Sequence, residues 1–97
     1  MDLRNTDLPK TLRALRREAG YKQNELALRL GISRETVSAI ENSKEETIKN
    51  LPDEVVRKWW SVCRSTAHEE TRNHFFEQIT DYFDKVMGYF KFMNFKR

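Results

Sequence analysis

The sequence predicts an all-α fold made of several short helices followed by one long C-terminal helix. Apolar residues recur at spacings of three and four along most of the 97 residues, as they do on one face of a helix. No run alternates apolar and polar residues in the way that a half-buried strand does. Gly20, Gly31 and Pro52 lie between the apolar stretches, where they mark helix boundaries.

The first three predicted helices, 8–19, 23–30 and 33–42, are short and closely spaced. A glycine directly follows each of the first two, and glycine readily takes the left-handed conformation that often ends a helix. Ser33 begins the third helix, because its hydroxyl can accept a hydrogen bond from the first turn. This part of the chain therefore predicts three helices joined by tight turns.

Residues 43–50 are polar and predict a loop with at most one helical turn. A fourth helix is expected to begin at Pro52, since proline suits the first turn of a helix and two acidic residues follow it. The apolar surface of this helix extends to Cys63, and residues 65–66 form a weak break. We therefore expect a first domain of residues 1–65.

A long helical pattern then runs from residue 69 to residue 95. Its apolar residues are spaced alternately by three and four, which is the a/d repeat of a coiled-coil seam. Eight of the 11 aromatic residues lie between 75 and 95, a surface too wide for one helix to hide. We expect residues 66–97 to be an amphipathic dimerisation segment, although a ligand pocket and a groove for a partner protein are alternatives. The expected dimer contacts are Phe76, Ile79, Phe83, Val86, Phe90 and Met93.

The charge and cysteine content permit DNA binding without establishing it. The chain has 18 Lys and Arg against 15 Asp and Glu, and its net charge of +3 fits nucleic acid but also many other proteins. A single cysteine excludes an intrachain disulfide and fits a reducing compartment. The N-terminus does not resemble a signal peptide, and no run of about 18 apolar residues could span a membrane. We expect a cytoplasmic protein without a membrane partner.

The residue types that perform enzyme chemistry are not arranged for it. Cys63, His68 and His74 follow one another at spacings of five and six, which place neither neighbouring pair on one helical face, and we expect no metal site. The sequence has no glycine-rich phosphate loop and no arrangement of Ser, His and Asp that would activate a nucleophile. We therefore expect neither an enzyme nor a bound cofactor.

The strongest motif lies in residues 23–42. Two helices that cross steeply through a tight turn need a small residue at the crossing, and Ala27 occupies that position. The turn needs a residue that accepts a positive φ, as Gly31 does. Val37 and Ile40 provide the apolar anchors of the second helix. These requirements, met together in one register, predict a helix-turn-helix.

Residues 12–42 resemble the helix-turn-helix domain of the phage repressor and Cro proteins, also called the Xre family. The resemblance extends to about residues 8–63 and does not include 66–97. It implies a small, multi-helix, repressor-like domain whose recognition helix, beginning at the third predicted helix, enters the DNA major groove as in those repressors. It also implies a buried ion pair between Arg16 and Glu41 that sets the angle of the recognition helix.

The same resemblance implies a set of DNA-binding residues. Arg34 would pair with guanine, and Glu35 would accept a hydrogen bond from cytosine or orient Arg34. Ser33 would cap the recognition helix, while Gln23 and Lys44 would lie at phosphates. The full set is Lys22, Gln23, Ser33, Arg34, Glu35, Thr36, Ser38, Ala39, Asn42 and Lys44.

The sequence departs from the family pattern at three positions in or next to this set. Lys22 stands where a threonine or serine usually caps the second helix, and Ser43 stands where glycine usually turns the chain. Glu35 places a negative charge toward DNA, which weakens binding unless its carboxylate is paired.

These features predict a homodimeric transcription regulator, acting as a repressor or autoregulator on an inverted repeat in double-stranded DNA. Two-fold symmetry would place the half-sites about 34 Å apart, as for the repressors that the chain resembles. The alternative is an antitoxin-type interaction module. Its aromatic C-terminal helix would bind another protein, and its DNA binding would serve autoregulation.

Overall fold

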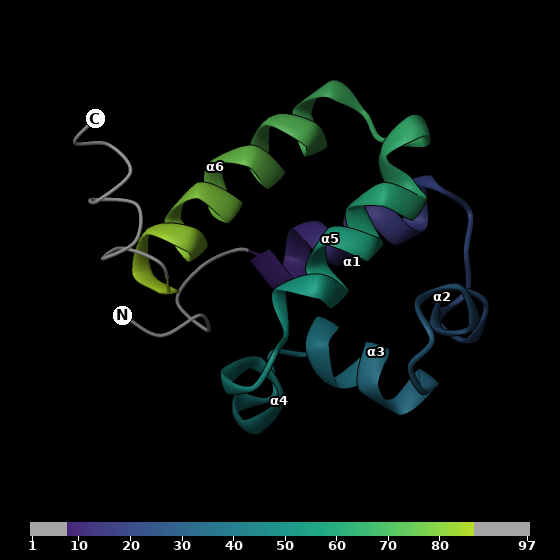
Figure 1. Ribbon diagram of the computed structural model, residues 1–97. Helices are drawn as coiled ribbons and strands as arrows, with labels where there is room; N and C mark the ends of the chain where they lie inside the picture. Colours follow the sequence, from purple (N-terminus) through teal and green to yellow (C-terminus); the bar gives the residue numbers. More distant parts are fainter. Residues whose placement is uncertain (1–7, 87–97) are drawn as a thin grey trace.

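The computed structural model describes residues 8–86, with side chains described as far as Thr80. These residues form six α-helices and one short 3₁₀ helix, and they contain no β-strand (Figure 1). The all-α prediction is confirmed. In chain order the elements are α1 (Leu8–Glu18), α2 (Gln23–Leu30), α3 (Arg34–Glu41), α4 (Glu45–Lys49), α5 (Asp53–Cys63), η2 (Arg64–Thr66) and α6 (Glu69–Val86).

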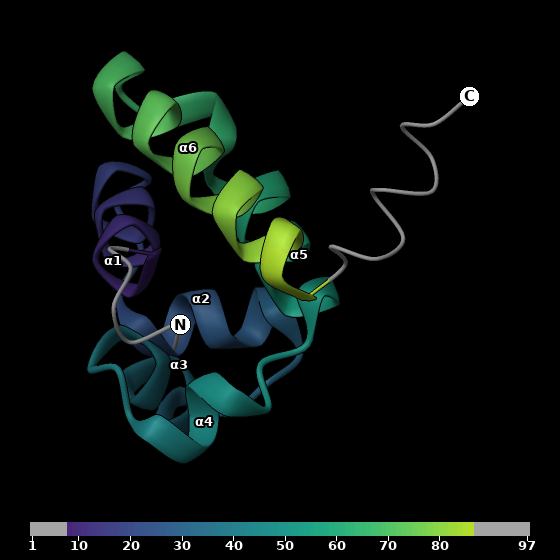
Figure 2. The same ribbon diagram turned by 90° about the vertical axis from the view of Figure 1, so that its left-hand side faces the viewer.

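The helices surround one core, and α1 and α5 lie between two groups of elements. The helices α2, α3 and α4 lie on one side of them, and α6 lies on the other (Figures 1 and 2). This arrangement leaves the outer face of α3 on the side of the molecule away from α6.

The core is formed where α1, α3 and α5 meet. The side chains of Leu12, Leu15, Val37, Ile40 and Trp59 are all 0% exposed. The indole Nε1 of Trp59 donates a hydrogen bond of 2.9 Å to the carbonyl oxygen of Leu12, which satisfies the one polar atom of this large side chain. Because each such side chain contributes roughly 1.5–3 kcal/mol when buried, this cluster fixes α3 firmly to the rest of the domain.

Cys63 belongs to the same core and is 0% exposed. Burial raises the pKa of its thiol to about 11. The thiol is therefore neutral near pH 7 and packs as a small apolar side chain, which is the role expected from the sequence.

The turn between α2 and α3 depends on Gly31. Its φ of 75° is left-handed, and its N–H and that of Ile32 both donate to the carbonyl oxygen of Ala27, over 2.9 and 3.1 Å. Ala27 is 4% exposed, because α3 passes close to it. The roles predicted for the small residue and for the glycine are both found in the structure.

Residues 43–50 are more ordered than the polar pattern predicts. They contain α4, a five-residue helix, where a loop with at most one turn was expected. Ile48, the lone large apolar residue of the stretch, is 2% exposed and joins the core. Its burial supplies the free energy that a polar segment of this length otherwise lacks.

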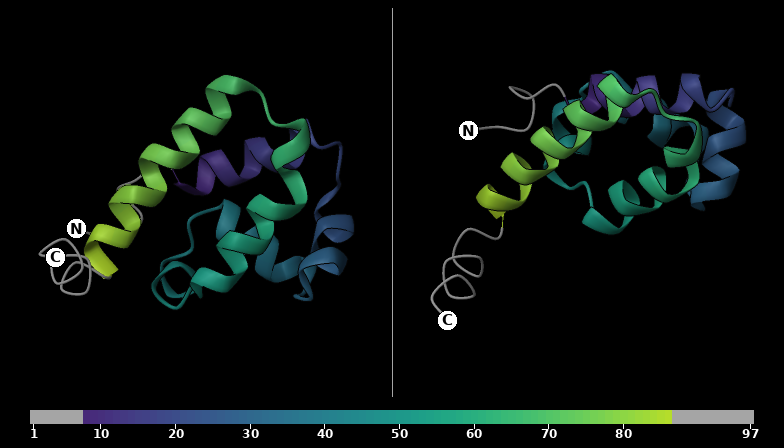
Figure 3. Two further views of the ribbon diagram at one scale, coloured as in Figure 1. Left: turned by 45° about the horizontal axis from the view of Figure 1, so that its top comes forward. Right: turned by 90° about the horizontal axis from the view of Figure 1, so that it is seen from above.

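α6 folds back across α1 instead of extending away from the domain (Figure 3). Phe75 is 4% exposed, and its ring stacks on that of Trp60 with a centroid distance of 4.6 Å and an interplanar angle of 5°. The hydroxyl of Thr11 donates a 2.6 Å hydrogen bond to Oε1 of Gln78. The first turns of α6 are therefore part of the same core as the preceding helices.

The start of α6 is held by a carboxylate from the end of α1. Oε1 of Glu18 accepts a 2.8 Å hydrogen bond from the backbone N–H of His68, and Oε2 accepts one of 2.7 Å from the Thr71 hydroxyl. His68 Nδ1 lies 3.5 Å from the same carboxylate. Glu18 thus caps α6 from a distant part of the chain and favours its first turn, as an anion at a helix N-terminus does.

This packing decides which aromatic residues at the start of the predicted dimer seam are buried within the chain and which are exposed. Phe75, which the seam did not include, is the buried aromatic residue, while Phe76 is 51% exposed. Ile79 is half-buried and packs against the core of its own chain. That residues 66–97 form a separate dimerisation segment stays a prediction, although the first turns of α6 pack on α1. Of the other seam residues, Phe83 and Val86 lie beyond the described side chains, and Phe90 and Met93 lie outside the described residues.

Within residues 8–86, no helix combines the length and the apolar character needed to cross a bilayer.

Candidate nucleic-acid interface

α3 has one buried face and one face open to solvent. Val37 and Ile40 are 0% exposed and anchor the helix in the core. Arg34 and Glu35 are exposed on the opposite side, and Ser38 is half-buried beside them. The helix therefore presents short and charged side chains in one row on the surface, as a helix that reads a DNA groove must.

Ser33 begins α3 as the sequence predicts. Its hydroxyl accepts a 3.1 Å hydrogen bond from the backbone N–H of Thr36 and lies 2.9 Å from the Thr36 hydroxyl. The cap satisfies one of the unpaired N–H groups of the first turn. Thr36 is half-buried, so its side chain stabilises the helix start and has only partial access to a ligand.

Arg34 and Glu35 interact only weakly with each other. Nη2 of Arg34 lies 4.0 Å from Oε2 of Glu35, and the two side chains are 56% and 80% exposed. This distance is too long for a hydrogen bond, and an exposed ion pair contributes little to the free energy of unfolding. Both side chains are therefore available to a ligand.

Half of the predicted DNA-binding residues meet in a shallow, open hollow between α3 and α4. Its lining combines two cations with three carboxylates, so the surface is not uniformly basic. The residues that line it are Arg34, Glu35, Ser38, Ala39 and Lys44 from the predicted set, with Glu45, Glu46 and Thr47 of α4.

At the start of α2, the side chain of Gln23 differs from its predicted position at a phosphate. Nε2 of Gln23 donates a 3.0 Å hydrogen bond to Oε1 of Glu41, so the side chain predicted to lie at a phosphate is partly held inside the protein. Lys22 is exposed, and its backbone N–H donates to Oε1 of Glu25 over 2.8 Å. The carboxylate of Glu25 stabilises the helix start that a lysine side chain cannot cap.

The ion pair between Arg16 and Glu41 forms as the family resemblance implies. Nε of Arg16 donates to Oε2 of Glu41 over 2.6 Å, and Nη2 donates to Oε1 over 2.9 Å. Nη1 of Arg16 donates to the carbonyl oxygen of Tyr21 over 2.9 Å. One guanidinium therefore ties the last residue of α3 to α1 and to the start of the motif.

The chain leaves α3 through a turn that uses Ser43 in place of glycine. Ser43 has a φ of 59°. Its N–H donates to the carbonyl oxygen of Ile40 over 3.1 Å, and that of Lys44 donates to Ala39 over 2.9 Å. This pair of bonds is the Schellman motif, which usually places glycine at the left-handed position. Asn42 is exposed, and its side-chain amide donates to the Ser38 hydroxyl over 3.2 Å.

The comparison with protein families decides what this geometry is. A family model described as helix-turn-helix matches residues 12–51. These residues are a helix-turn-helix domain of the repressor and Cro (Xre) type. Neither the curated proteins nor the solved structures give a match to the chain.

The helix-turn-helix domain makes the protein a DNA-binding regulator in general terms. Its α2 and α3 are the two helices of the motif, and α3 is the recognition helix. All ten residues predicted to bind DNA are at least partly accessible, since each is exposed or half-buried. Their individual roles at bases and phosphates stay predictions.

The outer face of α1, which contributes no residue to the predicted DNA-binding set, carries two arginines near the recognition helix. Arg13 of α1 lies beside the recognition helix, with its Nε 3.7 Å from Oε1 of Glu41. Arg17 is exposed one turn further along. The two arginines are four residues apart, a spacing that places them on one helical face, and this was the signal in the sequence that could have revealed them.

Proposed function

We propose that the protein is a sequence-specific transcription regulator, acting in the cytoplasm as a repressor or autoregulator. It binds an inverted-repeat operator as a homodimer. The observation that carries the proposal is the orientation of α3. Val37, Ile40 and Glu41 hold one face in the core, and this leaves Arg34 and Glu35 on the open face.

Base reading is assigned mainly to Arg34. Its side chain is 56% exposed at the start of the recognition helix, and the two parallel N–H donors of the guanidinium suit the O6 and N7 atoms of guanine. Ser38 lies one turn further along the same face and offers a hydroxyl to a second base pair. Lys44 and Asn42 follow the helix and are placed to hold a phosphate, which fixes the register without reading sequence.

The homodimer is proposed because one small domain offers a single recognition helix. The half-exposed ring of Phe76 on α6 lies beside the ring of Trp60, at 5.1 Å between centroids, and offers an apolar surface for self-association. α6 lies on the side away from the outer face of α3 (Figure 1), so contacts through α6 leave the recognition helix accessible.

Selection of binding sites from random double-stranded DNA tests the proposal in one experiment. We expect the enriched sequences to share an inverted repeat whose half-sites lie about ten base pairs apart, as in repressors of this type. Enrichment of a lone half-site would contradict the homodimer. Recovery of DNA with no shared motif would contradict sequence-specific reading.

An antitoxin-type interaction module is the second candidate, and one surface favours it. A shallow groove between α5 and α6 combines aromatic rings with two exposed arginines, a composition common at protein interfaces. It is lined by Trp60, Arg64, Ser65, Arg72 and Phe76. Light scattering on the purified chain separates the two candidates. A stable dimer supports the regulator. A monomer accompanied by non-specific aggregates supports an interaction module that lacks its partner.

A further inference from the structure

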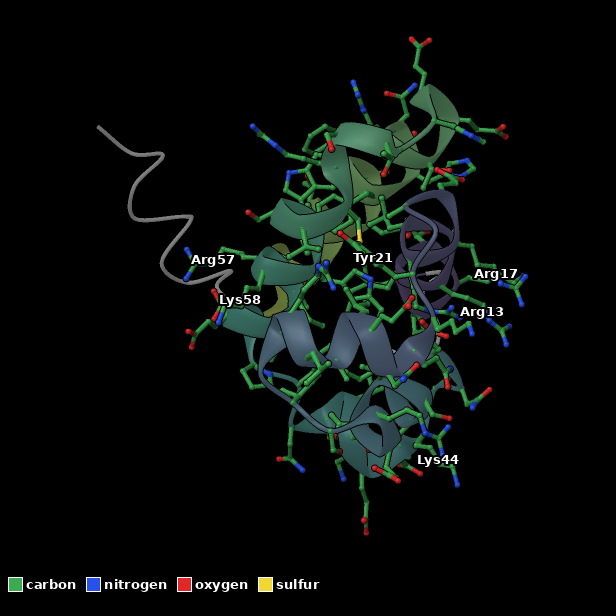
Figure 4. All side chains as sticks on the ribbon, turned by 90° about the vertical axis from the view of Figure 1, so that its right-hand side faces the viewer. Arg13, Arg17, Tyr21, Lys44, Arg57 and Lys58 are labelled. Carbon is green, nitrogen blue, oxygen red and sulfur yellow. The ribbon has the colours of Figure 1, made fainter. Side chains whose placement is uncertain are left out.

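Two arginines of α1 form a charged edge that the predicted DNA-binding set omits. Arg13 and Arg17 are one helical turn apart, and both guanidinium groups point outward on the flank that also carries Lys44 (Figure 4). Arg57 and Lys58 of α5 point away on the opposite flank of the same view (Figure 4). These two groups of cations therefore lie on opposite flanks of the domain.

Arg13 is held in place but not neutralised. Its Nε is buried and has no hydrogen-bond partner among the described residues, although Oε1 of Glu41 lies 3.7 Å away. The Glu41 carboxylate already accepts hydrogen bonds from Arg16 and Gln23. Two arginines against one carboxylate leave this cluster with an excess of one positive charge. The Arg13 side chain, which is 42% exposed, carries that excess to the surface.

The position of Arg13 identifies the chemistry of the partner. Glu41 is the last residue of the recognition helix, so Arg13 lies at the end of α3 from which Asn42 and Lys44 also project. A guanidinium is well suited to phosphate, because its planar N–H donors match two phosphate oxygens.

We propose that Arg13 and Arg17 bind backbone phosphates of the strand that passes the C-terminal end of α3, so that α1 forms part of the DNA interface. The assignment rests on the proposed DNA-binding function and extends it to a helix outside the motif. The contacts carry no base information. They raise affinity for all sequences equally and increase the dependence of binding on salt.

The test measures the salt dependence of binding by the full chain to a fluorescent duplex of mixed sequence. Arg13→Gln and Arg17→Gln are compared with Lys58→Gln, a charge-matched control on the opposite flank. Between about 50 and 200 mM salt, each arginine variant should lower the slope of log K against log salt by about 0.9, and the double variant by about 1.8. The control variant should keep the slope of the unmodified chain.

Thermal unfolding of each variant separates lost binding from lost structure. Arg17 is exposed, and its side chain has no hydrogen bond or ion pair with the residues that the structure describes, so Arg17→Gln decides the question even if Arg13→Gln weakens the domain. Folded arginine variants that keep both the affinity and the slope of the unmodified chain would overturn the proposal while leaving DNA binding intact. Equal losses in the Lys58 control would also overturn it. If the unmodified chain does not bind the duplex, the proposed function itself fails.

Discussion

The buried guanidinium of Arg16 and the carboxylate of Glu41 face each other in a bidentate ion pair, with N–O distances of 2.6 and 2.9 Å. Arg16 belongs to α1 and Glu41 to α3, so the pair joins residues 25 apart in the sequence. The side chains are 10% and 0% exposed. Because both charges are desolvated, we expect the pair to fix the angle of the recognition helix and the loss of either partner to be strongly destabilising.

Glu41→Ala should therefore be strongly destabilising. It leaves Arg16 buried without a counter-charge and removes the acceptor of Gln23, and breaking a buried pair in this way costs about 3–5 kcal/mol. Chemical denaturation measures the loss. Arg57→Ala is the matched control, because it removes an exposed pair with Asp53 at 3.5 Å and should cost less than about 1 kcal/mol.

A double replacement tests whether the loss comes from the unpaired charge. Arg16→Met combined with Glu41→Leu removes both charges and should recover much of the stability, since apolar residues often replace a buried pair without loss. The Tyr21 carbonyl loses its donor in this variant, so recovery should be incomplete. A double variant as unstable as Glu41→Ala alone would show that packing, and not charge, dominates at this position.

Ser43→Gly should stabilise the domain. The φ of 59° at Ser43 costs an L-residue about 1–2 kcal/mol, while glycine loses about 0.5–1 kcal/mol more entropy on folding. The expected net gain is about 0.5–1 kcal/mol, measured as a higher midpoint of denaturation. Ser43→Ala keeps the left-handed strain and should give no gain. Equal midpoints for the two variants would mean that strain at this turn is negligible.

The helices of the motif could be predicted from the sequence because their signals are local. Gly31 ends α2, Ser33 caps α3, and the small residue at Ala27 meets the crossing helix, all within a few residues of one another. The five-residue helix α4 was less visible, since Ile48 alone provides its buried face. A single apolar residue gives no period from which to infer a helix.

The position of α6 could not be predicted, because distant contacts determine it. Thr11 meets Gln78 across 67 residues, and Glu18 meets Thr71 across 53. Hydrophobic spacing alone favoured Phe76 as the inner residue of the helix. Adjacent residues on a helix point about 100° apart, and the fold turns the side of Phe75 toward the core.

Phe75 and Phe76 should therefore differ in their contributions to stability. Phe75→Ala removes a buried ring stacked on Trp60 and should cost about 3–5 kcal/mol. Phe76→Ala removes a half-exposed ring with two edge contacts, at 5.1 and 5.9 Å between centroids, and should cost about 1 kcal/mol. Denaturation of both variants under one set of conditions measures the difference. A reversed order would place the wrong face of α6 against the core.

The difference between buried Phe75 and exposed Phe76 also allows a test of the proposed homodimer that leaves the core intact. Truncation before α6 would also remove Phe75 from the core, so loss of a dimer in a truncated chain would be ambiguous. Phe76→Glu leaves the core contacts of Phe75 in place and adds a charge to the exposed ring position. We expect it to shift the molar mass by light scattering from dimer to monomer while the melting temperature falls by only about 4–8 °C, as the loss of about 1 kcal/mol implies. An unchanged dimer would remove Phe76 from the interface.

Arg34 and Glu35 should have opposite effects on DNA binding. Arg34→Ala removes the donor proposed to read guanine and should cost about 1–3 kcal/mol at the selected operator, with relaxed preference at one base pair. Glu35→Gln keeps the size of the side chain and removes a charge that repels phosphates. Because the contact with Arg34 is 4.0 Å long, little stability is lost, and affinity for mixed-sequence DNA should rise.

Competition binding with the selected operator and with mixed-sequence duplex measures both effects together. If Glu35 reads cytosine, Glu35→Gln lowers operator affinity while it raises affinity for mixed sequence, and the ratio of the two falls. If Glu35 only orients Arg34, the ratio falls for Arg34→Ala and changes little for Glu35→Gln. An Arg34→Ala variant with unchanged affinity and base preference would show that the register assigned to α3 is wrong, since no other exposed cation lies on the helix itself.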